Sequence, residues 1–340
     1  MTEKRDYPEL ASAARLSVAP MLDWTDRFCR LIHRQFSVRT LLYTEMVTAP
    51  ALVRGGALHL LDHDPAEHPV ALQLGGSDPA ELAEAAALGW QAGYGEINLN
   101  VGCPSDRVQS GCFGAVLMRD PALVARAVAA MIAASPAEVT VKCRIGVDDD
   151  DPAAVLPGFL DAVAGAGVRR VTIHARKAWL KGLSPKENRE IPPLDYPLVL
   201  AMKQRFPQLH VSVNGGITSL DQAESFLAAG LDGVMIGRAA YHEPAAILAD
   251  ADRRIFGDAA QAKTAGQVAR AMIPHIAAHV AAGGRAHAMT RHMLGLFAGR
   301  PGARAWRRHL SVAAARREAG AEIVEEALAL VERETARAAG

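Results

Sequence analysis

Eight short runs rich in Val, Ile and Leu recur along the chain, and helix-like sequence follows most of them. The runs occupy residues 16–22, 41–47, 70–75, 96–101, 139–145, 170–175, 210–214 and 233–237. Polar and apolar side chains do not alternate strictly within the runs, as expected of parallel strands that are covered on both faces. This repetition constrains the fold strongly, because a strand reaches a parallel neighbour only through a long connection, usually a helix.

Ala- and Leu-rich segments with helical patterns lie between the runs, at 78–89, 120–134, 152–164 and 219–229. Strand–helix alternation repeated in this way predicts an α/β fold, a (β/α)8 TIM barrel, in preference to an open doubly wound sheet. The glycine-rich fingerprint of a dinucleotide-binding sheet is missing after the first run, where residues 19–23 read APMLD.

The β signals stop after residue 253, and the remaining sequence has helical patterns with breaks at 283–284 and 300–302. We therefore predict an N-terminal extension over 1–15, a catalytic barrel over 16–257 and an all-helical domain over 258–340. No apolar run reaches the ~18 residues that a membrane span needs, and residues 1–15 are polar with no apolar signal core. We expect a cytoplasmic protein, without membrane contact and monomeric.

The cysteines have no zinc-like spacing and no CxxC pair. They are Cys29, Cys103, Cys112 and Cys143. We expect no metal site and no disulfide framework in a cytoplasmic chain of this size. Cys29, Cys112 and Cys143 read as small buried side chains.

The formal net charge is +0, but the charges are unevenly distributed. Residues 259–317 contain no Asp or Glu. Their cations are Lys263, Arg270, Arg285, Arg291, Arg300, Arg304, Arg307, Arg308, Arg316 and Arg317. A basic segment on a neutral protein indicates a site for a polyanion, although solvated helix faces balanced by acids elsewhere would have the same sequence.

Cys103 ends a strand-like run in the sequence INLNVGCPS over 97–105. Barrel enzymes place their chemistry where a strand meets the following loop. A nucleophilic thiol would need a nearby base, and the sequence pairs no His with Cys103. A thiol of ordinary pKa, about 8.5, stays protonated at neutral pH, so the role of a general acid is favoured.

Two glycine turns follow the last two predicted strands, at Asn214-Gly215-Gly216 and at Gly237-Arg238. Barrels commonly bind phosphate with backbone N–H groups of these two loops. Two ordinary turns would look similar one at a time, but their joint position favours a phosphate-bearing cofactor.

Four polar side chains lie at the ends of four successive predicted strands: Gln73, Asn100, Lys142 and His174. A flavin ring needs amide partners and a nearby cation, and Lys142 suits the latter role. Each residue also has an alternative. Lys142 could form a salt bridge or a Schiff base, His174 could be a core histidine, and Gln73 a loop cap.

The segments 18–27, 72–77 and 96–108 resemble the tRNA-dihydrouridine synthases, and 175–196 and 295–308 resemble the A subfamily. The resemblance extends from about residue 16 to residue 310. It implies an FMN enzyme on a (β/α)8 barrel with a helical tRNA-binding domain. NADPH would reduce the flavin, which would give hydride to uracil C6, while Cys103 would protonate C5. The uridines would be those at positions 20 and 20a of the tRNA D-loop.

The same resemblance assigns roles to residues of this sequence. The flavin ring would contact Pro20, Met21, Leu22, Gln73, Lys142 and His174. The ribityl phosphate would contact Asn214, Gly215, Gly216, Gly237 and Arg238. The tRNA would contact Asn100 at the target uridine, and Lys186, Arg189, Arg304 and Arg307 elsewhere.

Three other interpretations compete with this one. A flavin barrel acting on a free small molecule, such as a dihydroorotate dehydrogenase or an ene-reductase, would not need the basic helical part. An RNA-binding module on an inactive barrel would not retain Cys103 and the glycine turns. A Schiff-base barrel using Lys142 would be colourless.

Overall fold

The computed structural model describes residues 8–105, 113–259 and 261–339. The chain divides into two compact units. One, the barrel unit, comprises residues 1–22, 41–217 and 221–237. The other, the helical unit, comprises residues 23–40, 218–220 and 238–340. The division into domains at residues 15 and 257 stays a prediction.

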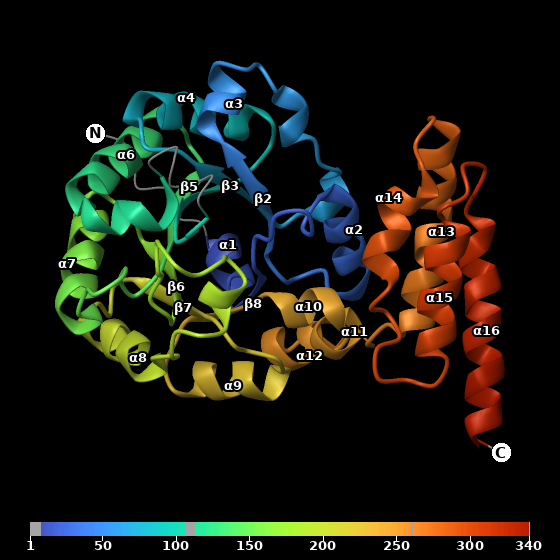
Figure 1. Ribbon diagram of the computed structural model, residues 1–340. Helices are drawn as coiled ribbons and strands as arrows, with labels where there is room; N and C mark the ends of the chain where they lie inside the picture. Colours follow the sequence, from blue (N-terminus) through green and yellow to red (C-terminus); the bar gives the residue numbers. More distant parts are fainter. Residues whose placement is uncertain (1–7, 106–112, 260, 340) are drawn as a thin grey trace. The chain divides into compact units, whose positions relative to one another are not determined.

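The barrel unit is built on one sheet of eight parallel strands, in the order β1-β8-β7-β6-β5-β4-β3-β2 (Figure 1). The strands are β1 Leu16–Val18, β2 Leu42–Thr48, β3 Val70–Gly75, β4 Glu96–Val101, β5 Glu138–Cys143, β6 Arg170–His174, β7 His210–Asn214 and β8 Gly233–Ile236. A parallel bridge between Ser17 and Leu41 joins the two outermost strands. The predicted barrel is thereby confirmed.

The observed strand bounds follow the sequence pattern closely. The predicted limits of β3, β4 and β7 are confirmed, whereas β1 ends at Val18 rather than at residue 22. Pro20 lacks the backbone N–H that a further ladder hydrogen bond would require, which explains the early end of β1.

Helices connect consecutive strands and surround the sheet (Figure 1). The longer ones are α4 Pro79–Gln91, α6 Pro121–Ala134, α7 Pro152–Gly165, α8 Tyr196–Arg205 and α9 Leu220–Ala228. Shorter segments are α3 Ala49–Val53, η1 Leu58–Leu61, η2 Pro65–Glu67, η3 Gly114–Arg119 and η4 Glu187–Arg189. In four of the helices an aspartate is the N-cap, and a proline occupies one of the first two positions. The caps are Asp78, Asp120, Asp151 and Asp195, and each accepts a backbone N–H of the first turn.

A small helix, α1 Pro8–Ala13, packs its apolar residues on the barrel core. Leu10 and Ala13 belong to a cluster with Tyr43 and Met235, which lie on β2 and β8. Residues 8–13, predicted as part of an extension, therefore contribute to the barrel unit.

The helical unit contains α2 Arg27–Phe36 from the early part of the chain and the elements after Gly237. These are α10 Arg238–His242, α11 Pro244–Leu248, α12 Ala251–Phe256, α13 Ala265–Ala281, α14 Ala286–Thr290, η5 Arg291–Met293, α15 Ala303–Ala313 and α16 Glu322–Ala339. Trp306 anchors α15, since its side chain is fully buried and its Nε1 donates to the carbonyl oxygen of Met293 over 2.8 Å. Across the described ranges, none of the helices is long and apolar enough to cross a bilayer.

Candidate active site

Polar side chains from five successive strands lie toward the carboxyl ends of the barrel strands. Gln73, Asn100, Lys142, His174 and Asn214 belong to β3, β4, β5, β6 and β7 in turn. Gln73 Oε1 accepts from Asn100 Nδ2 over 2.8 Å, and Asn214 Oδ1 accepts from Lys142 Nζ over 3.1 Å. The fold thus brings together residues that the sequence separates widely, at the end where barrel enzymes carry their sites.

Cys103 lies in the loop after β4 and is partly exposed. The side chain of Asn100 fixes the turn, because its Oδ1 accepts the backbone N–H groups of Gly102 and Cys103 over 3.1 and 3.0 Å. The carbonyl oxygen of Cys103 in turn accepts from the N–H of Ala115 over 2.9 Å. The remainder of the predicted motif, from residue 106 onward, and Cys112 lie outside the described residues.

Arg144 is a site residue that the sequence analysis missed. Its side chain is buried, and Nε donates to the carbonyl oxygen of Gly102 over 3.1 Å. Its Nη1 donates to the carbonyl oxygens of Asn188 and Lys177 over 3.0 and 3.2 Å. Burial lowers the pKa of its guanidinium to about 10, and neighbouring Arg189 acts in the same direction. The sequence position of Arg144 could have indicated this role, because it lies two residues after Lys142 and side chains two positions apart in an extended chain point to the same face.

Lys142 retains partial exposure, yet the protein atoms around its ammonium lower the pKa of the group to about 8. Displacement of water is the main cause, and the positive charge of Arg144 adds to it. The ammonium therefore loses its proton near pH 8, and a negatively polarised ligand would stabilise its charged form.

His174 is buried at the end of β6, and its Nε2 has no hydrogen-bond partner among the residues that the structure describes. Burial lowers the pKa of the imidazole well below its ordinary value, and the cations Arg144 and Lys142 lower it further. The ring is therefore neutral at physiological pH. A buried polar atom without a partner is uncommon in folded proteins and is typical of a ligand site.

The glycine turn after β7 lies tightly against its surroundings. Gly215 and Gly216 have φ angles of 111° and 70°, which side chains of L-residues rarely adopt. A Cβ on Gly215 would lie 2.7 Å from the His174 ring, and one on Gly216 would lie 2.6 Å from Leu194. Tyr196 holds the turn by donating its hydroxyl to the carbonyl oxygen of Gly215 over 2.6 Å.

The residues after β1 approach the turn after β8. A Cβ on Gly237 would lie 3.8 Å from the Met21 sulfur. Pro20 is partly exposed and Leu22 is 65% exposed, so both are available to a ligand. Arg238 begins α10 in the helical unit and is connected to Gly237 through the chain.

The predicted loop over 178–193 contains the single turn η4, and it carries Lys186 and Arg189 on exposed positions. Buried Asn188 organises this loop: its Oδ1 accepts from the N–H of Trp179 over 2.7 Å, and its Nδ2 donates to the carbonyl oxygen of Trp179 over 2.9 Å. Asn188 was not predicted from the sequence, because an isolated Asn in a polar loop is common.

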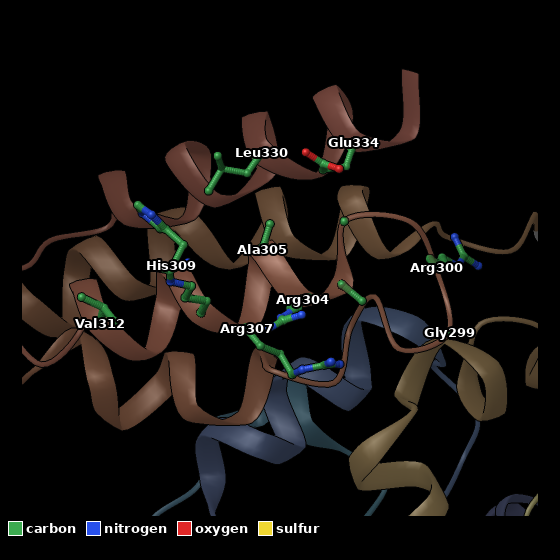
Figure 2. A pocket seen from close by; sticks show the side chains of 12 residues that line it. Gly299, Arg300, Arg304, Ala305, Arg307, His309, Val312, Leu330 and Glu334 are labelled. Carbon is green, nitrogen blue, oxygen red and sulfur yellow. The ribbon is translucent and has the colours of Figure 1, made fainter. Parts of the chain in front are cut away.

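Arg304 and Arg307 lie on exposed positions of α15, in the helical unit. They line a hollow of about 850 Å³, together with Arg300, Arg308 and His309 (Figure 2). From α16, Leu330 and Glu334 also line it. This hollow, here called the basic pocket, concentrates cations of the acid-free segment and suits a phosphate-rich ligand.

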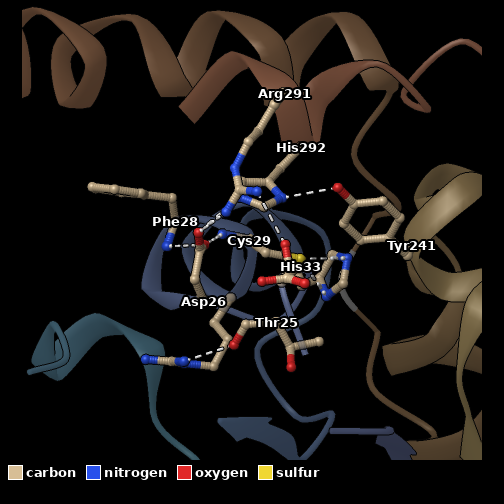
Figure 3. A network of polar contacts seen from close by, with 10 residues as sticks. Thr25, Asp26, Phe28, Cys29, His33, Tyr241, Arg291 and His292 are labelled. Atoms are coloured by element: carbon tan, nitrogen blue, oxygen red, sulfur yellow. Dashed lines mark hydrogen bonds and ion pairs between the residues drawn. The ribbon is translucent and has the colours of Figure 1, made fainter. Parts of the chain in front are cut away.

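A polar network centred on Asp26 holds α2 to the other elements of the helical unit (Figure 3). Asp26 caps α2 by accepting the N–H groups of Phe28 and Cys29, both over 3.0 Å. Its other oxygen accepts from Arg291 over 2.6 Å and lies 3.0 Å from His292 Nε2. Burial alone would raise the pKa of Asp26, but His292 and the hydrogen bonds from the Cys29 N–H and Arg291 together hold that pKa below its ordinary value.

Two of the cysteines behave as the sequence predicts. Cys29 and Cys143 are fully buried. Burial raises the pKa of the Cys143 thiol to about 12. Among the cysteines that the structure describes, Cys103 is therefore the one placed at the strand ends with access to solvent.

The barrel unit has the architecture of a barrel enzyme, with ionisable and amide groups at the strand ends and glycine turns after the last two strands. A solved structure with a similar fold is the old yellow enzyme homologue from Zymomonas mobilis. The superposition has a TM-score of 0.51 at 12% identity, and covers 73% of this chain and 90% of that chain. At such low identity, the likeness concerns the fold alone.

Residues 17–332 match the family described as dihydrouridine synthase, and the chain belongs to this family. Curated relatives named tRNA-dihydrouridine(20/20a) synthase include proteins from Vibrio cholerae and Salmonella typhi. Each is 55% identical, and each match covers 95% of this chain and 98% of the relative. A relative of the same name from Xanthomonas campestris pv. campestris is 54% identical, with 93% of both chains covered.

Proposed function

We propose that this protein reduces the C5–C6 double bond of uridines 20 and 20a in the D-loop of tRNA, using FMN as bound cofactor and NADPH as electron donor. The relatives at 52–55% identity that are named for this activity support the proposal. The structural observation that carries it is the thiol of Cys103 held partly exposed at the strand ends, where Asn100 fixes the loop.

The residues at the strand ends fit an FMN cofactor. The Nε2 of buried His174, which no described residue contacts by a hydrogen bond, and the glycine turn at 215–216, where a Cβ would collide with neighbours, both favour a ligand that approaches closely. Gln73, Lys142 and His174 would bind the ring, with Pro20, Met21 and Leu22 lining it. Asn214, Gly215, Gly216, Gly237 and Arg238 would hold the phosphate. When bound and reduced, FMN supplies a hydride.

Cys103 would supply the proton that completes the reduction at C5. A thiol can act as general acid at neutral pH because it is protonated there. Its loop is held by the hydrogen bonds to Asn100 Oδ1, by the hydrogen bond from Arg144 to Gly102, and by the hydrogen bond from Ala115 to Cys103. These hydrogen bonds fix the position of the proton donor, and the rate of proton transfer depends on that position.

Asn100 has one hydrogen-bonding group left for the target base. Its Oδ1 accepts from Gly102 and Cys103, and its Nδ2 donates one hydrogen to Gln73. Within the described ranges the second N–H of the amide has no partner, and a donor suits a carbonyl oxygen of uracil. We propose that Asn100 contacts the target uridine in this way.

Positively charged residues of both units would contact the tRNA. Lys186 and Arg189 lie in the exposed loop after β6, and Arg304 and Arg307 line the basic pocket. Arginine and lysine contacts to phosphates position an RNA without reading its sequence. The target uridine must leave the base stack to reach the strand ends. The enzyme would work in the cytoplasm as a monomer.

An anaerobic single-turnover experiment tests the proposed function. The flavin of the purified protein is reduced with NADPH, unmodified tRNA is added, and the return of oxidised-flavin absorbance is followed. We expect prompt reoxidation by tRNA and none by free uridine. Reoxidation by a small enone or by orotate instead would indicate a small-molecule reductase, and a colourless protein would contradict the cofactor assignment.

A further inference from the structure

A buried ionic cluster occupies the opposite, amino-terminal end of the barrel strands. Glu96 is the first residue of β4 and is fully buried. Its Oε2 accepts from Arg170 over 2.6 Å, and Arg170 also pairs with Glu138 over 2.7 Å. Glu96 Oε1 accepts hydrogen bonds from the hydroxyl groups of Tyr43 and Thr140, both over 2.7 Å. The carboxylate therefore acts only as an acceptor.

A chain of hydrogen bonds runs from this carboxylate through the barrel interior to the loop of Cys103. Thr140 Oγ1 accepts from Asn98 Nδ2 over 2.8 Å. Asn98 Oδ1 accepts from Gln73 Nε2 over 2.8 Å. Gln73 Oε1 then accepts from Asn100 Nδ2, also over 2.8 Å. Asn100 Oδ1 completes the chain by accepting the N–H groups of Gly102 and Cys103.

Every donor in this chain points the same way, from the Cys103 loop toward Glu96. Thr140 has a single proton, and donating it to Glu96 leaves its oxygen to accept from Asn98. That choice turns the oxygen of Asn98 toward Gln73, and the oxygen of Gln73 toward Asn100. Asn100 must then face the loop with its oxygen, which is the group that two backbone donors require. The two ends of the chain thus demand the same direction.

We propose that Glu96 is a positioning residue that acts through Thr140, Asn98 and Gln73 to orient the amide of Asn100 and thereby hold the Cys103 loop. The inference rests on the proposed role of Cys103 in the reaction. The side chains of the chain, from Glu96 to Asn100, are at least nine-tenths buried, so water cannot readily replace a missing partner. If Asn100 turned over, its Nδ2 would face two N–H donors, and the loop would move.

Thr140 is the place to interrupt the chain. Thr140→Val keeps the shape of the side chain and removes the hydroxyl that links Asn98 to Glu96. Thr140→Ser retains the hydroxyl and serves as conservative rescue. Tyr43→Phe is the matched control, because it removes the other hydroxyl bonded to the same Glu96 oxygen and leaves the chain to Cys103 intact.

Two measurements on full-length, FMN-bound protein report on the loop. One is the rate of Cys103 alkylation by iodoacetamide, followed by peptide mass spectrometry without tRNA. The other is the rate of flavin reoxidation by unmodified tRNA. In Thr140→Val we expect alkylation to become roughly tenfold faster and reoxidation roughly tenfold slower, as for the loss of one buried hydrogen bond. Thr140→Ser and Tyr43→Phe should resemble the wild type in both.

The outcomes separate the inference from the proposed function. Wild-type rates in Thr140→Val, or equal changes in Thr140→Val and Tyr43→Phe, would overturn the positioning role. Equal changes in Thr140→Val and Thr140→Ser would show that the effect does not depend on the hydroxyl, which Ser retains, and would overturn it as well. A wild-type protein that does not reduce tRNA would contradict the proposed function alone, and the alkylation rates would still decide the role of Glu96.

Discussion

Arg144 donates a hydrogen bond from its Nε to the carbonyl oxygen of Gly102 over 3.1 Å. Gly102 is the residue immediately before Cys103. The same guanidinium binds two carbonyl oxygens of the loop after β6. We expect Arg144→Lys to reduce tRNA-dependent turnover by roughly 10–100-fold, because an ammonium cannot reproduce the planar set of donors and the loops shift. Steady-state dihydrouridine formation measures the effect.

Flavin content separates a shifted loop from general unfolding. Arg144→Lys should retain bound flavin, and Arg54→Lys, in an exposed pair with Glu81, should behave as the wild type. Full activity in Arg144→Lys would show that its three carbonyl contacts do not position the thiol.

The thiol itself is tested by Cys103→Ala. Removal of a general acid should slow turnover by roughly 10²–10⁴-fold while tRNA and flavin binding persist. Cys143→Ala is the control, because that thiol is fully buried in the barrel and burial raises its pKa to about 12. Unchanged turnover of Cys103→Ala would remove Cys103 from the mechanism.

Lys142 should make FMN binding depend on pH. Its pKa of about 8 lies below the ordinary value, so the ammonium is charged below that pH and loses its proton above it. A charged donor binds an electron-rich ring edge more tightly, so FMN affinity should fall as pH rises through about 8. Fluorescence titration of flavin-free protein with FMN measures this, and Lys142→Met should weaken binding and abolish the dependence. An equal pH dependence in Lys142→Met would assign it to another group.

Much of the barrel could be predicted from sequence, since the strand runs and the Asp–Pro helix starts are local signals. Gly215 and Gly216 were equally visible, because a backbone that needs glycine restricts the sequence at that position. Arg144, Asn188 and Glu96 could not be found in this way. Their roles depend on partners on other strands and loops, and the residue type alone does not reveal such long-range pairing.

Arg304 and Arg307 should contribute to tRNA binding through phosphate contacts. Each Arg→Ala change should weaken binding and reduce the slope of log K against log salt by about 1, with no change in flavin content. Arg333→Ala is the control, since Arg333 is exposed on α16 but does not line the basic pocket. Parental binding by both variants at low and high salt would place the RNA site elsewhere.

Asp26 should stabilise the helical unit in a pH-dependent way. Its pKa is lower in the folded protein than its ordinary value, so its contribution is present above pH about 4 and is lost as pH falls through the folded-state pKa. Asp26→Asn should reduce the free energy of unfolding by about 1–3 kcal/mol at neutral pH. Urea denaturation between neutral and acid pH should show the two proteins converging. Asp161→Asn is the control. Asp161 forms an exposed ion pair with Arg205 at 3.9 Å, so its loss should have little effect on the free energy of unfolding at any pH.

The contact between Asp26 and Arg291 spans 265 positions of the chain. On a ribosome that adds about 5–20 residues per second, α2 therefore waits roughly 13–50 s for this partner. For most of that interval Leu31, Ile32 and Phe36, which are buried in the finished protein, lack the elements that pack on α2, because α11, α13, α14 and η5 are all made after residue 243. The nascent chain therefore carries an amphipathic helix with an uncovered apolar face, and that face needs shelter from aggregation until these later elements have emerged.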